Sequence, residues 1–204
     1  MKKNKKNVFE AYNKIADWFS VNRYALPIEK EYLDHLVTLA GGAPTVLDIG
    51  CGTGMPMMQY LISLGIRVTG VDASHRMLAI ARANLPHTEL IQQDMRSLSL
   101  GTKFDAIVAW HSFFHLPADD QPGMFSIFKD HLTNKGVLLF TSGNEDGEAW
   151  GINGGEDIYH ASLSTERYQE LLKEHGFKVI SYKANDHEAG GATVWMVQQQ
   201  LSEG

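Results

Sequence analysis

The amino-acid sequence predicts an α/β fold: an open, doubly wound sheet of seven strands, mostly parallel, with an antiparallel strand at its C-terminal end. Short apolar segments alternate with helical segments through most of the chain, which is typical of a parallel sheet covered on both faces. The last two apolar segments are separated only by Ala184–Ala192. This link is too short for a helical crossover, so these two strands should pair antiparallel.

Each strand is predicted from a short run of apolar and β-branched residues. The seven predicted strands are Thr45–Ile49, Arg67–Val71, Glu89–Gln92, Phe104–Trp110, Gly136–Thr141, Phe177–Lys183 and Thr193–Gln198.

The helices are predicted from apolar residues at helical spacing and from end signals. Ser74 and Ser164 are candidate N-caps, and Gly41-Gly42 follows the end of the second helix. The six predicted helices are Val8–Phe19, Pro27–Leu39, Met55–Leu64, Ser74–Asn84, Ala118–Leu132 and Ser164–His175.

Length and composition indicate one domain. The chain has 204 residues, of which 44% are hydrophobic and 21% charged. No apolar run is long enough to span a membrane, and the net charge of −6 disfavours a nucleic-acid partner. The single cysteine, Cys51, excludes an internal disulfide and indicates a reducing, cytoplasmic compartment. We expect a monomer or a homodimer.

The N-terminal segment is basic, with four lysines among its first six residues. It lacks the apolar segment of a secretory signal. Contact with nucleic acid or anionic lipid is one interpretation, but a disordered, solvated tail over residues 1–7 is the simpler one. Residues 8–204 then form the single domain, in which residues 8–40 are a helical cap.

The turn after the first strand is rich in glycine: V-L-D-I-G-C-G-T-G-M-P, Val46–Pro56. The dinucleotide fingerprint G-x-G-x-x-G would need a glycine where Met55 stands. Asp48 would repel a pyrophosphate but suits a ligand with an ammonium group. The spacing therefore favours a cationic nucleoside with an amino-acid tail over NAD.

This turn resembles motif I of the class I S-adenosylmethionine-dependent methyltransferases. Further motifs resemble that family in the same order: V-T-G-V-D-A-S (Val68–Ser74), Q-Q-D-M (Gln92–Met95), F-D-A-I-V-A-W-H-S-F-F-H-L (Phe104–Leu116) and N-K-G-V-L-L-F-T (Asn134–Thr141). The resemblance extends over roughly Tyr12 to Gln198. It implies a Rossmann-like fold, S-adenosylmethionine as cofactor and methyl transfer as the activity.

The resemblance also implies roles for individual residues. Asp72 would accept hydrogen bonds from both ribose hydroxyls, and Asp94 would bind the adenine amino group beside Met95. Other interpretations are that Asp72 caps a helix, that Asp48 orients the loop, and that Met95 and Cys51 only pack. The expected cofactor-binding residues are Tyr12, Asp48, Gly50, Cys51, Gly52, Gly54, Asp72, Ala73, Asp94, Met95 and Trp110.

Methyl transfer is an in-line displacement, and positioning supplies much of the catalysis. We expect substrate contacts from the N-terminal helices, from the loop after the fourth strand, and from the polar segment Ser142–His160. This last segment is expected to be a loop that acts as a substrate lid. The expected substrate-binding residues are Trp18, Arg23, His115, Trp150 and Tyr159.

A base is needed only if the acceptor binds in its protonated form. His115 is the first candidate, followed by His111 and His160. His115 could instead cap a helix or pack, and the three histidines could bind a metal with nearby acids such as Glu145. Their spacing does not support a metal site, so none is expected.

The acceptor is expected to be a small molecule. A-W-H-S after the fourth strand differs from the N-P-P-Y-like turn of enzymes that methylate amino groups in DNA or glutamine. Cytosine C5 chemistry would need a cysteine after the fourth strand, and Cys51 precedes it. Two alternatives are a nicotinamide-dependent oxidoreductase and a non-catalytic protein that binds S-adenosylmethionine.

Overall fold

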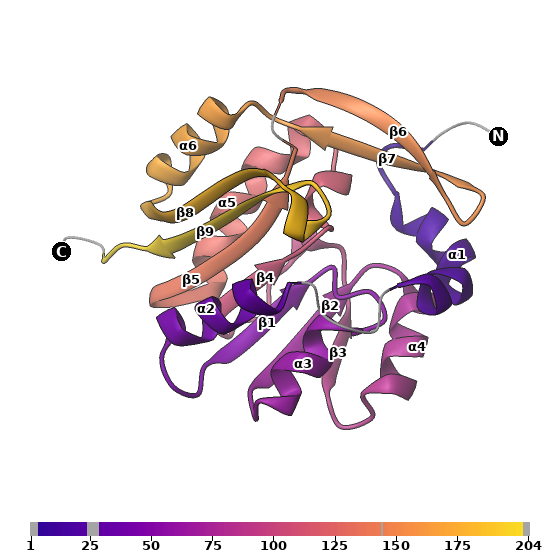
Figure 1. Cartoon of the computed structure of the whole chain (residues 1–204), viewed down its shortest axis with the longest axis horizontal. Helices are drawn as coiled ribbons and strands as arrows, with labels where there is room; N and C mark the ends of the chain where they lie inside the picture. The colour runs from indigo at the N-terminus through magenta and orange to yellow at the C-terminus, as the bar shows by residue number, and fades with distance from the viewer. Residues whose placement is uncertain (1–3, 24–28, 144, 202–204) are drawn as a thin grey trace.

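A computed structural model describes residues 4–23, 29–143 and 145–201. Its main sheet has seven strands in the order β3-β2-β1-β4-β5-β9-β8 (Figure 1). β1 to β5 are parallel, and β9 lies antiparallel between β5 and β8, so the predicted fold is confirmed. The strands are β1 Thr45–Ile49, β2 Arg67–Asp72, β3 Glu89–Gln92, β4 Phe104–Ala109, β5 Leu132–Ser142, β8 Phe177–Asp186 and β9 Ala192–Gln199.

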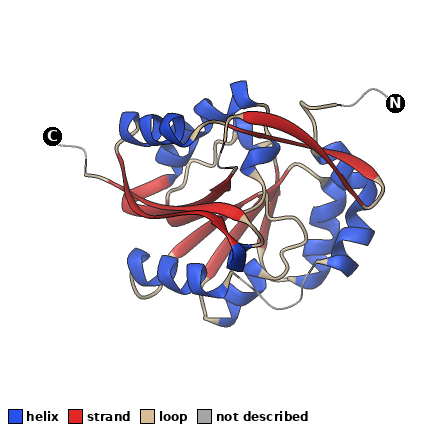
Figure 2. Cartoon of the chain, turned by 45° about the horizontal axis from the view of Figure 1, so that its top comes forward, coloured by secondary structure: helices blue, strands red, loops and turns tan. Residues whose placement is uncertain are grey.

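Helices cover both faces of this sheet (Figure 2). α2, α3 and α4 pack on one face, and α5 and α6 pack on the other. The α-helices are α1 Phe9–Asn22, α2 Lys30–Ala40, α3 Met57–Ser63, α4 His75–Asn84, α5 Gln121–His131 and α6 Thr165–Glu174. Short 3-10 helices are η1 Met95–Ser97, η2 Phe113–His115, η3 Ala118–Asp120 and η4 His187–Ala189.

Local end signals position the helices largely as predicted. The Ser74 side chain accepts a hydrogen bond from the Met77 backbone, and Ser164 caps α6 through Arg167 in the same way. α2 begins at Lys30 among the described residues, and the expected start at Pro27 lies outside them.

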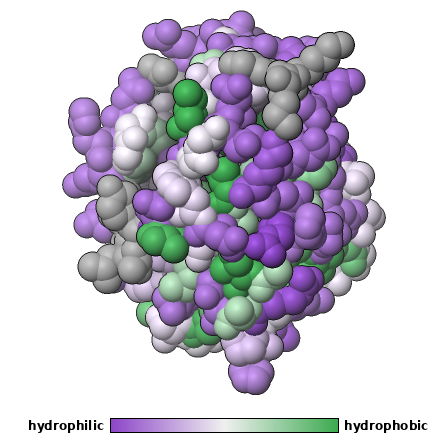
Figure 3. Space-filling model, turned by 90° about the vertical axis from the view of Figure 1, so that its right-hand side faces the viewer, coloured by the Kyte–Doolittle hydropathy of each residue, from purple (hydrophilic) through white to green (hydrophobic). Residues whose placement is uncertain are grey.

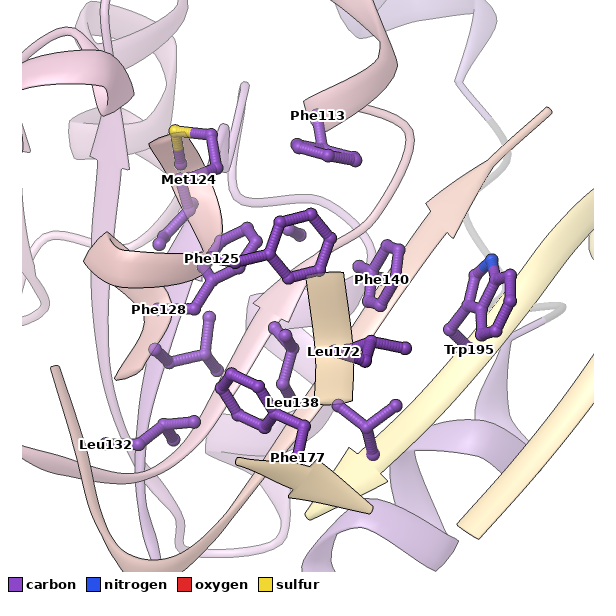
Figure 4. Packing of buried hydrophobic residues seen from close by; sticks show 14 of the residues in the cluster. Phe113, Met124, Phe125, Phe128, Leu132, Leu138, Phe140, Leu172, Phe177 and Trp195 are labelled. Atoms are coloured by element: carbon purple, nitrogen blue, oxygen red, sulfur yellow. The ribbon is translucent and has the colours of Figure 1, made fainter. Parts of the chain in front are cut away.

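An aromatic core fills the space between the sheet and α5 and α6 (Figure 4). Phe113 of η2 is fully buried there, with its ring centroid 5.7 Å from Phe140 and 5.9 Å from both Phe125 and Phe128. Since η2 lies in the loop after β4, this buried ring fixes the loop that also carries His111 and His115.

The expected loop over Ser142–His160 is instead largely a β-hairpin. β6 (Gly147–Asn153) pairs antiparallel with β7 (Glu156–Ser162) in a separate two-stranded sheet. Gly154 and Gly155 connect the strands with φ of +54° and +85°. Such a Gly-Gly pair between two short strands is a hairpin signal that the high content of polar residues obscured.

α1 and the hairpin lie together above the carboxyl ends of the main strands (Figure 1), and we call this pair the roof. Ion pairs link its parts: Lys14 to Glu156 at 2.8 Å, and Lys5 of the preceding segment to Glu148 at 3.0 Å. On the side of the molecule that carries α1 and the hairpin tip, apolar residues are scattered among polar ones (Figure 3). The roof therefore has a mainly polar exterior.

In the described part of the chain, no helix combines the length and the apolar character that a membrane span requires. Disorder of residues 1–7 stays a prediction: residues 4–7 are placed in the structure, and the first three residues are outside the described ranges.

Candidate functional site

A cavity of about 340 Å³ lies where the carboxyl ends of β1, β2 and β4 meet α1. The structure brings every expected cofactor-binding residue to its lining, together with Arg23 and all three candidate histidines. The predicted residues that line it are Tyr12, Arg23, Asp48, Gly50, Cys51, Gly52, Gly54, Asp72, Ala73, Asp94, Met95, Trp110, His111, His115 and His160.

The glycine turn forms the floor of this cavity. The Gly50 and Cys51 backbone N–H groups both donate to the Val71 carbonyl oxygen, at 2.7 and 3.0 Å, which ties the turn to the end of β2. Gly50 has a φ of +79°, and a Cβ atom there would lie 2.3 Å from the Ser112 Cβ. Only glycine fits at this position, because both the backbone conformation and the available space exclude a side chain.

Asp72 ends β2 beside the glycine turn. Its Oδ2 accepts a hydrogen bond from the Gly52 N–H at 2.8 Å, and its Oδ1 accepts one from the Ser74 N–H at 2.7 Å. Burial raises the pKa of Asp72, and these two hydrogen bonds oppose that shift. Since Ser74 itself caps α4, capping is not the role of Asp72. A carboxylate oxygen has further lone pairs, so Asp72 can still accept from a ligand.

Asp48 is a second buried carboxyl group in the lining, with 5% of its surface exposed. Burial, and then the neighbouring Asp72, raise the pKa of Asp48 to about 7, although Arg23 lowers it. A positively charged ligand in this cavity would therefore favour the ionised form of Asp48.

Asp94 has a cationic partner that sequence reasoning missed. The Arg96 Nε donates to Asp94 Oδ1 at 3.0 Å, and another guanidinium nitrogen donates to Asp120 at 3.1 Å. Burial raises the pKa of Asp94, but the side chain and backbone of Arg96 outweigh it and lower the pKa. Arg96 therefore keeps Asp94 ionised as a hydrogen-bond acceptor. The signal was an arginine two residues after the aspartate.

His115 joins the two parts of the roof. Its Nδ1 lies 2.8 Å from the Tyr159 carbonyl oxygen, and its Nε2 lies 2.8 Å from the Tyr12 hydroxyl. A carbonyl only accepts, so Nδ1 must carry the proton. Burial lowers the pKa of His115 to about 3, so the ring is neutral and Nε2 accepts from Tyr12. Both ring nitrogens are thus engaged, and the geometry favours a positioning role over that of a free base.

The other two histidines lie near His115 around the ring of Phe114. The His160 ring centroid is 4.8 Å from His115 and 5.4 Å from Phe114, and the His111 centroid is 5.7 Å from Phe114. Burial lowers the pKa of His111 to about 4 and also lowers that of His160. These rings are therefore uncharged near pH 7.

Trp110 and Arg23 share one partner that the sequence reasoning did not identify. The Trp110 indole N–H donates to Glu29 Oε1 at 3.1 Å, and Arg23 donates to the same oxygen at 3.0 Å. Glu29 is fully buried, so this contact fixes the position of both residues in the lining.

Three expected substrate-binding residues do not line the cavity. Trp18 lies beside Gly154 at the hairpin turn and is 43% exposed. Trp150 and Tyr159 pack against each other, 5.2 Å between ring centroids, in the small apolar cluster under the hairpin. Residues on alternate strand positions point to opposite faces, so Tyr159 faces this cluster while His160 faces the cavity. Lining residues that the sequence did not indicate include Phe9, Phe19, Met77, Gln93, Phe114 and Asn153.

In the ranges that the structure describes, no group of three or more histidine, cysteine, aspartate or glutamate side chains is arranged to hold a metal ion.

The sequence is similar to known proteins over different lengths. Residues 46–136 match a family model described as a methyltransferase domain. An uncharacterised protein of Haemophilus influenzae is 30% identical over 190 residues, which are 85% of this chain and 72% of that protein. A dTDP-3-amino-3,4,6-trideoxy-alpha-D-glucopyranose N,N-dimethyltransferase of Streptomyces venezuelae is 35% identical over 99 residues, 48% of this chain and 41% of that enzyme. The chain spans only 38% to 43% of this enzyme and of three other curated relatives that it matches.

Solved structures share the fold at lower sequence identity. CalS10 of Micromonospora echinaspora, an amino pentose methyltransferase with bound S-adenosylmethionine, has a TM-score of 0.72 at 18% identity and covers 98% of this chain and 100% of its own. An S-adenosylmethionine-dependent methyltransferase of Clostridium acetobutylicum has a TM-score of 0.73 at 18% identity, with coverage of 94% and 100%.

Proposed function

The chain belongs to the class I S-adenosylmethionine-dependent methyltransferases, and on this premise we propose that it transfers a methyl group from S-adenosylmethionine to a small-molecule acceptor. The observation that carries the proposal is the pair of carboxyl groups, the buried Asp48 and the partly buried Asp72, in one cavity beside the glycine turn. Two acids at this place oppose a pyrophosphate and favour a cation that also has hydroxyl groups.

The residues present fit this cofactor. Asp48 is buried, with a pKa near neutrality, so the α-ammonium group of a bound ligand would stabilise its charge. Asp72 would take the ribose hydroxyls, and Asp94, held ionised by Arg96, would accept from the adenine amino group. Gly50 and Gly52 would let the ligand approach the backbone closely.

When bound, S-adenosylmethionine supplies a methyl group on a sulfonium, which is a good leaving group. The protein then has to position the acceptor in line and exclude water. The roof serves this purpose, since α1 and the hairpin cover the cavity and His115 holds them together through Tyr12 and Tyr159. We therefore assign to the hairpin the lid function expected for residues 142–160.

Tyr12 is the residue that His115 orients. As donor to His115 Nε2, its hydroxyl presents the oxygen as an acceptor to the cavity. Tyr12→Phe should lower turnover about tenfold and change cofactor affinity less than about threefold, because it removes one hydrogen bond. His115→Gln should give the same pattern. If His115→Gln lost most of its turnover while Tyr12→Phe kept normal turnover, His115 would instead be assigned as a base.

Calorimetry with S-adenosylhomocysteine and, separately, with NAD tests the proposed cofactor. We expect binding of the first and none of the second. Binding of NAD alone would support the oxidoreductase alternative. If S-adenosylhomocysteine binds but a broad screen of metabolites yields no methyl transfer, the result would support the alternative of a non-catalytic protein that binds S-adenosylmethionine.

The acceptor class and the cellular context stay predictions. Curated relatives include N,N-dimethyltransferases named for dTDP-amino sugars, which supports a small molecule as acceptor. We expect no nucleic-acid or membrane partner, a monomer or homodimer, and a cytoplasmic location, on the grounds of charge and cysteine content.

A further inference from the structure

A second cavity, of about 450 Å³, opens where the end of β5, the base of the hairpin and the turn before β9 meet. It shares His111, Phe114 and His160 with the first cavity, and none of the residues assigned to the cofactor lines it. We propose that this second cavity is the acceptor site and that it takes a flat, uncharged nitrogen heteroaromatic ring. This inference rests on the proposed function.

The side chains around the second cavity favour a planar ligand. The shared wall consists of three aromatic rings with neighbouring centroids 5.4 to 5.7 Å apart. Much of the remaining lining is small: Gly143, Gly147, Ala149, Gly190, Gly191 and Ala192. A planar ring can approach the backbone at these small residues and contact the aromatic wall, an arrangement that aromatic pairs stabilise.

The charges around the second cavity disfavour an anionic ligand. Among the lining residues that the structure describes, Glu145 and Glu148 are acidic and none is a lysine or an arginine. Glu148 already binds Lys5 at 3.0 Å. A carboxylate or phosphate on the ligand would therefore lie near acids without a lining cation to offset the repulsion.

The histidines in the shared wall fit an uncharged acceptor. His111 and His160 have lowered pKa values because they are buried, so they remain neutral near pH 7. A neutral imidazole offers one donor and one acceptor nitrogen but no charge. Such a wall can hydrogen-bond to a ring N–H or a ring nitrogen, and it gives an anionic group no ionic partner.

The test uses two matched probes, benzimidazole and benzimidazole-5-carboxylate, with the full chain in saturating S-adenosylhomocysteine. Saturation-transfer NMR titrations give the affinity of each probe. We expect benzimidazole to bind at least about tenfold more tightly than its carboxylate. Glu145→Lys should narrow or reverse this preference by adding a cation to the lining.

A pair of matched variants locates the probe. Ala149→Phe fills the second cavity and should abolish benzimidazole binding. Ala184→Phe places the same side chain at an exposed position of β8 outside both cavity linings and should leave the binding unchanged. Calorimetry with S-adenosylhomocysteine reports whether each variant is folded, since neither alanine lines the first cavity.

Three outcomes would overturn the inference: equal or tighter binding of the carboxylate, a benzimidazole signal that survives Ala149→Phe, or no benzimidazole signal in a chain that binds S-adenosylhomocysteine. If the unsubstituted chain does not bind S-adenosylhomocysteine at all, the failure lies with the proposed function.

Discussion

The floor and the roof of the first cavity are held by different kinds of contact. In the floor, Gly52 donates to Asp72, 20 residues away, and both groups are at least partly buried. In the roof, Lys14 pairs with Glu156 across 142 residues, with 47% and 33% of these side chains exposed. The floor thus depends on hydrogen bonds to the backbone in a region of low dielectric. The ion pairs of the roof join residues far apart in the sequence and are solvated, and they add to the less exposed contacts of His115 with Tyr12 and Tyr159.

This difference has an energetic consequence. Buried hydrogen bonds to a carboxylate contribute more than exposed ion pairs, which are screened by water and salt. We therefore expect substitutions in the floor to have large effects and those at the roof's ion pairs to have small ones. The following variants test this contrast.

The largest effect is expected at Gly50. Gly50→Ala should lower the free energy of unfolding by about 2–4 kcal/mol, because it combines a left-handed backbone with a clash against Ser112. Gly52→Ala is the matched control: its φ is also positive, at +56°, but the nearest atom to the new Cβ would be 3.8 Å away, in Phe19. It should cost only about 1–2 kcal/mol in urea unfolding. Equal losses would contradict the predicted clash.

Asp72→Ala should weaken the binding of S-adenosylhomocysteine by about 1–3 kcal/mol in calorimetry, the value of lost charge-assisted hydrogen bonds. Asp105→Asn is the control, since Asp105 accepts from the Thr45 N–H at 2.9 Å and does not line the cavity. It should lower stability and leave the affinity unchanged. Unchanged affinity in Asp72→Ala would refute the assigned role.

Asp48 should make stability depend on pH. Its pKa is about 7 in the folded chain and about 3.9 when unfolded, so between these values the folded state holds a proton that the unfolded state releases. Stability should therefore fall as pH rises from 5 to 7, by up to about 1.4 kcal/mol per pH unit from this group. Asp48→Asn removes this contribution in urea unfolding at several pH values.

The same group predicts that a cationic ligand binds more tightly as pH rises through about 7, since Asp48 ionises. Asp105→Asn is again the control and should keep the slope of stability between pH 5 and 7. An identical slope in Asp48→Asn and the unsubstituted chain would show that Asp48 does not titrate in this range.

The smallest effect is expected in the roof. Lys14→Glu should lower the free energy of unfolding by no more than about 0.5 kcal/mol, less at high salt, because the pair with Glu156 is exposed. The double variant Lys14→Glu/Glu156→Lys should recover the loss in a double-mutant cycle. If Lys14→Glu lowered the free energy of unfolding as much as Gly52→Ala does, the predicted difference between floor and roof would be wrong.

The same contrast explains what the sequence could predict. The strand that begins at Thr45 and the glycine turn after it are marked by local sequence patterns. Their positions, and the placement of Asp48 and Asp72, could therefore be predicted directly from the sequence. The residues expected to bind the cofactor all line one cavity because the carboxyl ends of parallel strands meet there.

The roof could not be predicted in this way. The partners of His115 are Tyr12 and the Tyr159 carbonyl oxygen, and no local pattern records a contact between a side chain and a distant backbone atom. Ser142–His160 was expected to be a loop, so the alternation of side chains along a strand was not considered there. This alternation turns Tyr159 away from the cavity. Arg96 is only two residues from Asp94, but its orientation also depends on Asp120, 24 residues away, which no local pattern indicates.

Phe113 has one further consequence, for attempts to re-engineer this protein. Its ring is buried among Phe125, Phe128 and Phe140, while its chain neighbours Ser112 and Phe114 line the first cavity. A larger or smaller side chain at one of these aromatic positions would shift the loop after β4 without replacing any residue of the cavity lining. A library for altered acceptor preference should therefore include α5, whose side chains line neither cavity.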